Sequence, residues 1–296
     1  RYATYTGSDP RQAPAALATV PYIEQMFGAY HVSGGLRELG RALYERATSI
    51  GVKFEFGATV ANIATEPKVS GVTLADGRFL AADIVVANSD ASNVYQNLLS
   101  AEAQQRTSSA KKSLAKATPS LSGFVILQAM SGKTADFEHH NVFFPENYDD
   151  EFDSVFGIGK KVSPVADPTI YICSPNDSKM APAGNESWFM LINAPRHDPA
   201  SGVDWANSEL KDSYTKQILS RLKDRGIDAS DRVTWQQNLT PADLERNTLA
   251  PGGSIYGTSS NGMRSAFLRP GNITKIPNLY LVGGSSHPGG GLPLVG

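Results

Sequence analysis

Apolar residues recur at helical spacing directly after a glycine pair near the start of the chain. The stretch reads GGLRELGRALYERATSI, and its apolar positions are Leu36, Leu39, Leu43 and Ala47. Spacings of three and four residues place these side chains on one helix face. A helix that begins at Gly34 and Gly35 presents backbone N–H groups and the positive end of its dipole, which suits an anion or a close backbone approach.

A second helical pattern lies in the last third of the chain. Residues 208–225 carry one apolar stripe, and Gly226 is a stop signal for the helix. The stripe consists of Leu210, Tyr214, Ile218 and Leu222. The pattern is typical of an ordinary surface helix that packs by one face.

Between residues 51 and 90 the pattern changes to short β-rich segments. VKFEF at 52–56 alternates apolar and charged positions and predicts a strand with one apolar face. Three segments follow, at 59–66, 69–77 and 78–89, and turn-forming residues separate them. The last segment contains IVVA, a wholly apolar run that predicts a strand covered on both faces within a larger parallel sheet.

The middle of the chain predicts a separate sheet. Its apolar, β-branched and aromatic runs are SLSGFVILQAM (120–130), NVFFP (141–145), TIYICSP (169–175) and SWFMLINAP (187–195). Polar loops of varied length join these runs, which favours a mostly antiparallel arrangement.

The chain ends on an apolar run followed by many glycines, NLYLVGGSSHPGGGLPLVG. LYLVG has the composition of a buried parallel strand, and its carboxyl end meets Gly283 and Gly284. Glycine at that position lets a flat ligand lie against bare backbone, and residues after Pro293 would begin a helix whose N–H groups face the same ligand. The pattern predicts a cofactor cradle; the alternative is a connecting loop without a ligand.

Composition excludes several classes of function. The chain has 296 residues, 41% hydrophobic and 19% charged, with a net charge of -2, so nucleic acid is not an expected partner. The single cysteine, Cys173, is interpreted as a small packed hydrophobe in a reducing, cytoplasmic compartment. The chain begins at Arg1 without a methionine and ends inside a glycine motif, so we expect it to be a piece of a longer protein.

Metal and nucleophile chemistry is not expected from the sequence. His139 and His140 are adjacent, which predicts diverging side chains, and no partner set of cysteine and histidine stands near them in sequence. No G-x-S-x-G elbow or H-E-x-x-H helix occurs. We therefore expect no metal site.

Five ordered blocks resemble one family. The C-terminal NLYLVGGSSHPGGGLP is similar to the flavin-contacting signature of phytoene desaturase-type carotenoid desaturases, which are FAD-dependent amine oxidoreductases. The other similar blocks are residues 21–47, 51–63, 72–90 and 250–270. The family's Rossmann-like domain carries an N-terminal G-x-G-x-x-G fingerprint, and no such motif after a strand occurs here. The resemblance implies the C-terminal part of a desaturase, which by itself would bind FAD poorly or not at all.

The resemblance also implies positions for the cofactor. It assigns FAD contacts to Gly34, Gly35, Val60, Ala87, Asn88, Gly283, Gly284, Gly290, Gly291, Leu292 and Pro293. Val60 matches the position whose backbone meets the adenine, and Gly290 to Pro293 match the approach to the isoalloxazine ring. The family often has proline shortly after the asparagine matched by Asn88, whereas Ser89 and Asp90 stand here. His287 is a weak candidate for catalysis, and a structural hydrogen-bonding role is the alternative.

The resemblance implies a mixed α/β and α+β fold, a partial Rossmann-like FAD-binding domain plus a mostly antiparallel substrate domain with flanking helices. The expected division is a substrate-domain helical segment (1–33), part of the FAD-binding domain with a β-meander (34–95), the substrate-binding domain (96–270) and a flavin-contacting strand and glycine loop (271–296). Arg264 and Arg269 are polar residues of a matched block, with a surface or ion-pair role as the alternative to a functional one.

The implied reaction is desaturation of a linear isoprenoid or carotenoid, in which the flavin takes a hydride at N5. The aromatic runs would then line an apolar tunnel, with ordinary sheet core as the alternative. Quinone or oxygen is the implied electron acceptor. Peripheral membrane contact is expected, with Leu292, Leu294 and the segment 148–156 as candidate contacts and a solvated loop as the alternative for that segment. Two other functions stay open: another flavin enzyme, such as a polyene saturase or an amine oxidase-like enzyme, and a catalytically silent binding module.

Overall fold

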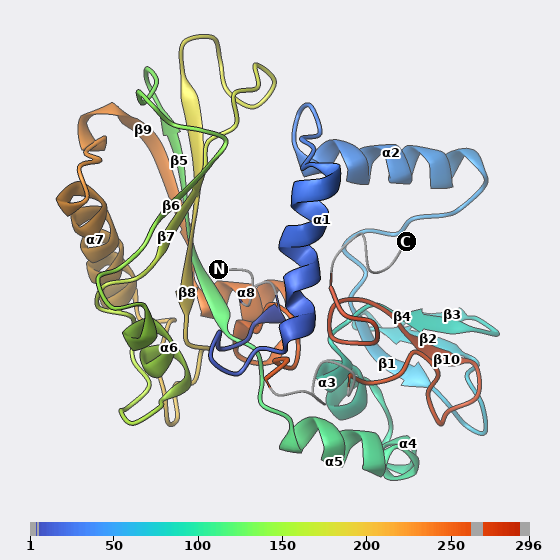
Figure 1. Ribbon diagram of the computed structural model, residues 1–296. Helices are drawn as coiled ribbons and strands as arrows, with labels where there is room; N and C mark the ends of the chain where they lie inside the picture. The colour runs from blue at the N-terminus through green and yellow to red at the C-terminus, as the bar shows by residue number, and fades with distance from the viewer. Residues whose placement is uncertain (1–3, 5, 262–268, 291–296) are drawn as a thin grey trace. The chain divides into compact units, whose positions relative to one another are not determined.

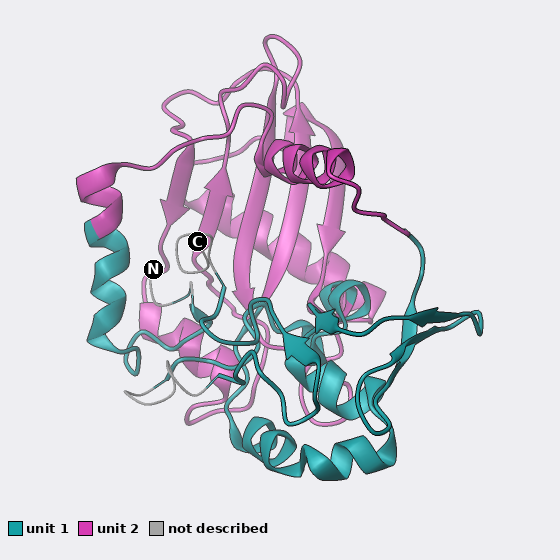
Figure 2. Cartoon of the chain, turned by 90° about the vertical axis from the view of Figure 1, so that its right-hand side faces the viewer, with its two compact units in different colours: residues 1–22, 56–122, 243–296 teal, residues 23–55, 123–242 magenta. Residues whose placement is uncertain are grey.

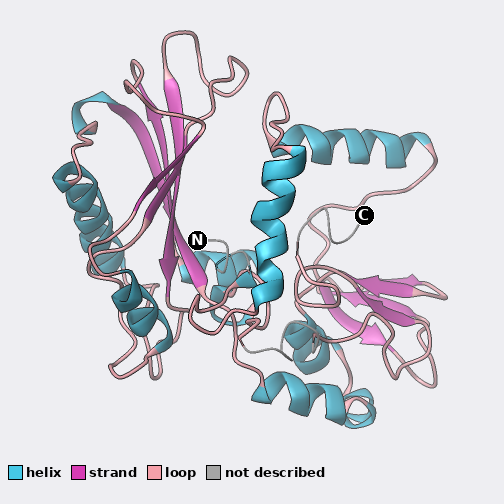
Figure 3. Ribbon diagram, in the orientation of Figure 1, coloured by secondary structure: helices cyan, strands magenta, loops and turns pink. Residues whose placement is uncertain are grey.

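The computed structural model describes residues 4, 6–261 and 269–290. The chain divides into two compact units (Figure 2): residues 1–22, 56–122 and 243–296 form unit 1, and residues 23–55 and 123–242 form unit 2. Helices and strands occur together in each unit (Figure 3), which confirms the mixed fold class. The functional division at residues 33, 95 and 270 stays a prediction.

Unit 2 is built on a five-stranded sheet (Figure 1). Its strands are β5 (Ser122–Met130), β6 (His140–Phe143), β7 (Ile170–Cys173), β8 (Glu186–Ala194) and β9 (Val233–Leu239), in the order β6-β7-β8-β5-β9. The pairs β6–β7, β7–β8 and β5–β9 are antiparallel, as the sequence predicts. The four predicted runs each contain a strand, whereas β9 was missed because its sequence, VTWQQNL, carries polar residues that mask the alternation.

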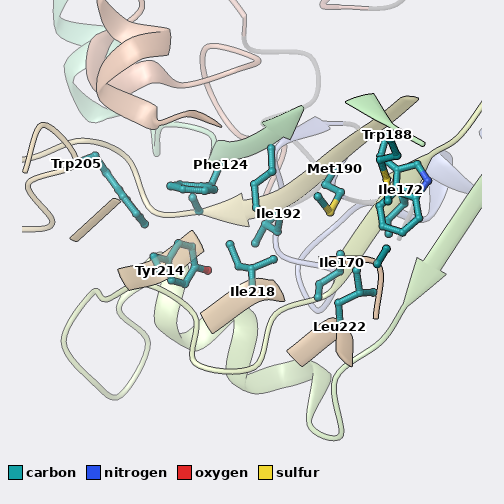
Figure 4. Packing of buried hydrophobic residues seen from close by; sticks show 14 of the residues in the cluster. Phe124, Ile170, Ile172, Trp188, Met190, Ile192, Trp205, Tyr214, Ile218 and Leu222 are labelled. Atoms are coloured by element: carbon teal, nitrogen blue, oxygen red, sulfur yellow. The ribbon is translucent and has the colours of Figure 1, made fainter. Parts of the chain in front are cut away.

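The core of unit 2 lies between this sheet and helix α7 (Ser208–Asp224) (Figure 4). Phe124 of β5 packs against Tyr214 of α7 with ring centroids 5.2 Å apart. Ile218 and Leu222 continue the predicted stripe and are buried, so this helix is fixed to the sheet by its apolar face. Helix α6 (Tyr148–Phe156) adds buried Phe152 to the unit.

The remaining helices are short or lie early in the chain. They are η2 (Ala15–Ala18), α1 (Thr19–Phe27), α2 (Leu36–Ser49), α3 (Ala91–Asn93), the π-helical turn η3 (Val94–Leu98), α4 (Ala101–Arg106), α5 (Ser108–Lys116), η4 (Ser230–Arg232), α8 (Pro241–Thr248) and η5 (Pro251–Gly253). Helix α2 confirms the predicted helix after the glycine pair. Its apolar positions, however, stay exposed, with 72% of Leu36 and 62% of Leu43 accessible.

Unit 1 contains the predicted meander. Strands β1 (Val60–Ala64), β2 (Gly71–Leu74) and β3 (Phe79–Ala81) form an antiparallel sheet in that order. The predicted turn at Asp76 and Gly77 joins β2 to β3. The strand predicted at 52–56 is wrong: in the described structure these residues belong to no sheet, and a strand needs a hydrogen-bonded neighbour whatever its side-chain alternation.

The returning apolar strand is confirmed. It is β4 (Val85–Ala87), which pairs in parallel with β10 (Leu279–Leu281) near the end of the chain. One face of the pair packs in a core with Ile63 and Val94. Among the described residues this core covers one face of β4, and Val86 on the other face is 57% exposed, so cover on both faces within a larger parallel sheet stays a prediction.

Candidate functional site

The candidate site lies where the two parallel strands of unit 1 end. Val282 N donates to the Ala87 carbonyl at 3.0 Å, which brings the segment after β4 beside the segment after β10. Gly283 has φ 103°, and a Cβ added there would lie 2.3 Å from Asn88 Oδ1. Glycine is therefore required at Gly283 by both its backbone conformation and its neighbour. The structure brings together the predicted residues Ala87, Asn88 and Gly283.

The glycine loop folds back on itself after this point. A Cβ added at Gly284 would lie 3.8 Å from Gly290 Cα, so these two predicted residues face one another as bare backbone. Gly289, with φ 114°, approaches Arg269 so closely that a Cβ would be 3.1 Å from Nε. These glycines, which we call the glycine cradle, let the backbone of the loop run close to its neighbours, and bare backbone of this kind is what close contact with a flat ligand needs.

The side chain of Arg269 holds the glycine loop in place through a hydrogen bond to its backbone. Only 8% of this residue is exposed, and Nη1 donates to the Gly284 carbonyl at 2.6 Å and to the Tyr256 carbonyl. Burial lowers the pKa of the guanidinium, and the charge of Asp90 acts in the opposite direction. The surface or ion-pair alternative for Arg269 was wrong, because its hydrogen bonds go to main-chain carbonyls that no sequence pattern reveals.

Other polar side chains tie the two strand ends together. Asn272 Nδ2 donates to the carbonyls of Leu281 and His287, at 3.0 and 2.8 Å. Ala91 N, at the start of α3, donates to Ser285 Oγ at 2.9 Å. These hydrogen bonds join the loop after β4 to the glycine loop after β10. They help to fix the positions of Gly283 and Gly284. Sequence reasoning missed the roles of the Asn272 and Ser285 side chains.

His287 is anchored by its backbone. Its N–H donates to the Pro270 carbonyl at 2.8 Å, and its own carbonyl accepts from Asn272, while the residue is exposed. These contacts favour the structural alternative; a catalytic role stays a prediction. Arg264, Gly291, Leu292, Pro293 and Leu294 lie outside the described residues.

Val60 opens β1 in the same unit and pairs with Leu74. Ile63, three residues on, packs in the core that also holds Ala87 and Leu281, so the meander and the site share one support. The adenine contact assigned to Val60 stays a prediction.

Gly34 and Gly35 belong to unit 2. Gly34 N donates to Asp177 Oδ2 at 2.6 Å, and Gly35, with φ 83°, precedes the first residue of α2. The hydrogen bonds from Gly34 and Lys179 hold the pKa of the Asp177 carboxyl well below its usual range. The carboxylate of Asp177 therefore supplies the anion that the sequence predicts at the start of α2.

The sheet of unit 2 presents an apolar face on the side opposite α7. Alternation along the strands assigns Leu127, Tyr171, Phe189, Leu191 and Trp235 to this face, through the registers of β5–β9 and β7–β8. Phe189 is 40% and Trp235 51% exposed, whereas Phe124, Trp188 and Met190 lie in the core. The expected tunnel lining is wrong for these three residues, because strand alternation sends them to the α7 side.

Two further expectations change with the structure. Segment 148–156 is a helix, α6, rather than a loop, and Phe152 and Val155 are buried in it; its membrane contact stays a prediction. The side chains of His139 and His140 do not diverge: their rings meet edge-on with centroids 4.4 Å apart, since residue 139 lies just before β6 and escapes strand alternation. No helix among the described residues is both long and apolar enough to cross a bilayer.

The family follows from comparison with known proteins. Residues 6–293 match the flavin containing amine oxidoreductases, and the chain belongs to this family. A flavin would be held by the backbone at the ends of β4 and β10, where Gly283 lets the two strand ends approach more closely than any side chain would allow.

Two curated relatives have names from carotenoid metabolism. The chain is 38% identical over 299 residues to 1-hydroxycarotenoid 3,4-desaturase of Flavobacterium sp., covering 99% of this chain and 58% of the relative. It is 32% identical over 296 residues to 4,4'-diapolycopene oxygenase of Methylomonas sp., covering 98% and 57%. The resemblance to carotenoid desaturases is confirmed, and the chain spans somewhat more than half the length of these relatives.

A solved oxidoreductase from Methanosarcina mazei supports the fold. It matches with a TM-score of 0.62 at 16% identity, covering 96% of this chain and 58% of that one.

Proposed function

We propose that this chain is part of an FAD-dependent desaturase that introduces double bonds into a linear isoprenoid or carotenoid. The observation that carries the proposal is the glycine cradle at the carboxyl ends of β4 and β10, in a chain of the flavin containing amine oxidoreductases. The names of the two curated relatives support the substrate class.

In this proposal the chain's own residues hold the cofactor mainly by backbone. Ala87, Asn88, Gly283 and Gly284 form the contact at the strand ends, with Arg269 holding the loop in shape. The other assigned contacts are Gly34, Gly35, Val60, Gly290, Gly291, Leu292 and Pro293. FAD, when bound, would supply the acceptor for a hydride from one C–H bond, and the second hydrogen would leave the neighbouring carbon as a proton taken up by water or a basic group.

The apolar face of the unit 2 sheet is the proposed substrate surface. A polyene offers no hydrogen-bonding groups along its length, so its position is set by shape and burial of apolar area. Half-exposed Phe189 and Trp235 supply broad, stiff surfaces for such a chain. A substrate of this kind dissolves in lipid rather than in water, which supports peripheral membrane contact. We further propose a cytoplasmic enzyme with quinone or oxygen as its electron acceptor.

The test begins with the full-length gene product purified without added flavin, beside the 296-residue chain. We expect the full-length protein to carry FAD, identified by its visible spectrum and mass spectrometry. Incubation with linear carotenoids, with and without a hydroxyl group, should then yield products lighter by two hydrogens. Products that gain oxygen would indicate an oxygenase instead, and a flavin-free protein that refuses FAD would leave the binding-module function.

Gly283→Val sharpens this test in the full-length protein. The added side chain collides with Asn88 and fills the cradle, so FAD content should fall to a small fraction of wild type. Gly226→Val is the matched control, because Gly226 has a similar φ of 90° but nothing within 4 Å of an added Cβ. Equal FAD loss in the two variants would assign the effect to backbone strain rather than to the cradle.

A further inference from the structure

Four of the chain's five histidines belong to unit 2, and three of them, His31, His139 and His140, form a cluster with the chain's single cysteine. His139 lies between two other rings, with centroids 4.4 Å from His140 and 4.8 Å from His31. One donor atom each from His139, His140 and Cys173 lies within 4.8 Å of the other two. The proposed desaturation assigns no chemical role to His139, His140 or Cys173.

The sheet itself creates the juxtaposition. His140 and Cys173 are directly opposite one another on the antiparallel strands β6 and β7, so their side chains emerge on the same face at neighbouring positions. Tyr171, two residues before Cys173, shares that face, and its hydroxyl is hydrogen-bonded to His140 Nδ1 at 2.8 Å. The ring of His140 is therefore held in place by a strand neighbour.

A carboxylate orients the outer side of the cluster. His31 Nε2 is 2.9 Å from Asp177 Oδ2, and the same oxygen accepts from Gly34 N at the start of α2. His31 in turn contacts the His139 ring edge-on. Carboxylate and hydroxyl partners that orient imidazole rings are typical of the outer sphere of metal sites.

We propose that His139, His140 and Cys173 bind a divalent transition-metal ion of the Zn²⁺ type. A thiolate and two imidazoles are the donors that such an ion prefers, and three protein ligands leave a fourth position for water or another ligand. Donors around bound Zn²⁺ lie roughly 3.5 Å apart, so side-chain shifts of about 1 Å close the site. The partial burial of His139 and Cys173 shields the ion from bulk water on one side.

Burial affects the two ligands in opposite ways, because a neutral His139 ring favours metal binding whereas a protonated Cys173 thiol opposes it. Burial and the charge of His31 lower the pKa of His139, which favours the neutral ring that binds metal. Burial raises the pKa of the Cys173 thiol, so the free site holds S–H. Binding then replaces the thiol proton by the metal: the S–H bond breaks, a Zn–S bond forms and one proton is released to water, with no change of oxidation state.

The first experiment titrates the 296-residue chain with Co²⁺ after removal of metals. We expect thiolate-to-cobalt charge-transfer absorption that saturates at one equivalent and is abolished by added Zn²⁺. Cys173→Ser should lose this absorption. His140→Ala should weaken Co²⁺ binding at least ~10-fold, the lower end of the effects found for changes in the outer sphere of metal sites. His197→Asn, which alters a histidine bound to Trp205 N outside the cluster, should bind as wild type does.

Two further measurements keep the result decisive. Circular dichroism identifies a variant that lost metal by unfolding, and Zn²⁺ should slow alkylation of Cys173 in the unmodified chain, where folding is not in question. Asp177→Asn should weaken Co²⁺ binding by less than about 10-fold while keeping the charge-transfer absorption, because Asp177 contacts His31 and not a proposed ligand. Absence of that absorption together with unchanged alkylation in Zn²⁺ would overturn the proposal, whatever the flavin content of the full-length protein.

Discussion

The sheet of unit 2 and the parallel pair of unit 1 bury their apolar residues differently. In unit 2, alternate residues of β5 and β8 pack against α7, and Phe124, Met190 and Ile192 are fully buried. In unit 1, β4 is apolar throughout, yet Val86 is 57% exposed while Ala87 is buried. An antiparallel sheet needs cover on one face, whereas a parallel strand of this composition is suited to cover on both. Among the described residues, the apolar strands of unit 2 are therefore more completely covered than β4.

The two regions also differ in what holds their strands in place. Unit 2 relies on ladders and a broad apolar core. The pair β4–β10 is short and is supported by side chains that bind main-chain groups: Asn278 Nδ2 donates to the Asp83 carbonyl at 2.9 Å, beside the contacts of Asn272 and Arg269. Packing dominates in the first region and polar anchoring in the second.

Phe124→Ala tests this contrast most strongly. The change removes a ring that contacts Trp205 and Tyr214 in the core of unit 2, and should lower the free energy of unfolding by about 3–5 kcal/mol in chemical denaturation. The counterpart Val86→Ala should change it by less than ~0.5 kcal/mol, because that side chain is mostly in water. Equal losses would contradict the contrast.

Arg269→Met tests the polar anchors of unit 1. The aliphatic part of the side chain is kept while the hydrogen bonds to the Gly284 and Tyr256 carbonyls are lost, so we expect destabilisation of about 1.5–3 kcal/mol. Arg78→Met, at an exposed arginine of the same unit, is the control and should have little effect. If both variants unfold alike, Arg269 does not anchor the loop.

Glu151→Gln asks whether unit 2 also depends on a buried polar group. Burial raises the pKa of Glu151, although Thr169 N and Asn193 Nδ2 donate to its carboxyl. The folded state therefore binds the proton more tightly than the unfolded state, so the contribution of Glu151 to stability is full below its unfolded pKa and is lost as pH rises through the folded pKa. Denaturation at several pH values should show a fall that the variant lacks; parallel curves would contradict this.

Asp228→Asn should have the smallest effect. Hydrogen bonds from Lys223 and Ser230, near the end of α7, lower the pKa of Asp228 to about 2. The stabilising effect of this carboxylate is present above its unfolded pKa and is lost as pH falls through about 2. The pair is exposed, so the two proteins should differ only slightly at neutral pH and converge in acid. A large difference at neutral pH would show that surface pairs contribute more to unit 2 than its packing suggests.

Local patterns predicted much of the fold because they reflect local physics. Alternation in β8 and the stripe of α7 report which face is buried, and the glycines after β10 report where backbone must approach closely. The strand predicted at 52–56 failed because alternation says nothing about a hydrogen-bonding partner. β9 was missed because its polar residues hide the pattern.

The candidate site was predictable in part for the same reason. Asn88 and Gly283 follow apolar strands, and parallel pairing brings such strand ends together. Arg269 was misjudged because its partners are main-chain carbonyls. The proximity of Cys173 to His140 was not predicted, because it depends on the register between β6 and β7, which cannot be read from the sequence.

The parallel pairing of unit 1 has a consequence for the order of folding during synthesis. Asn278 and its partner Asp83 are 195 residues apart, and the 123–242 part of unit 2 is translated between them. At about 5–20 residues per second, roughly 10–40 s pass before β10 exists to complete β4. In a nascent chain the sheet of unit 2 would thus form while the apolar β4 still lacks its partner strand β10. Chaperone binding to β4 would be most valuable at this stage.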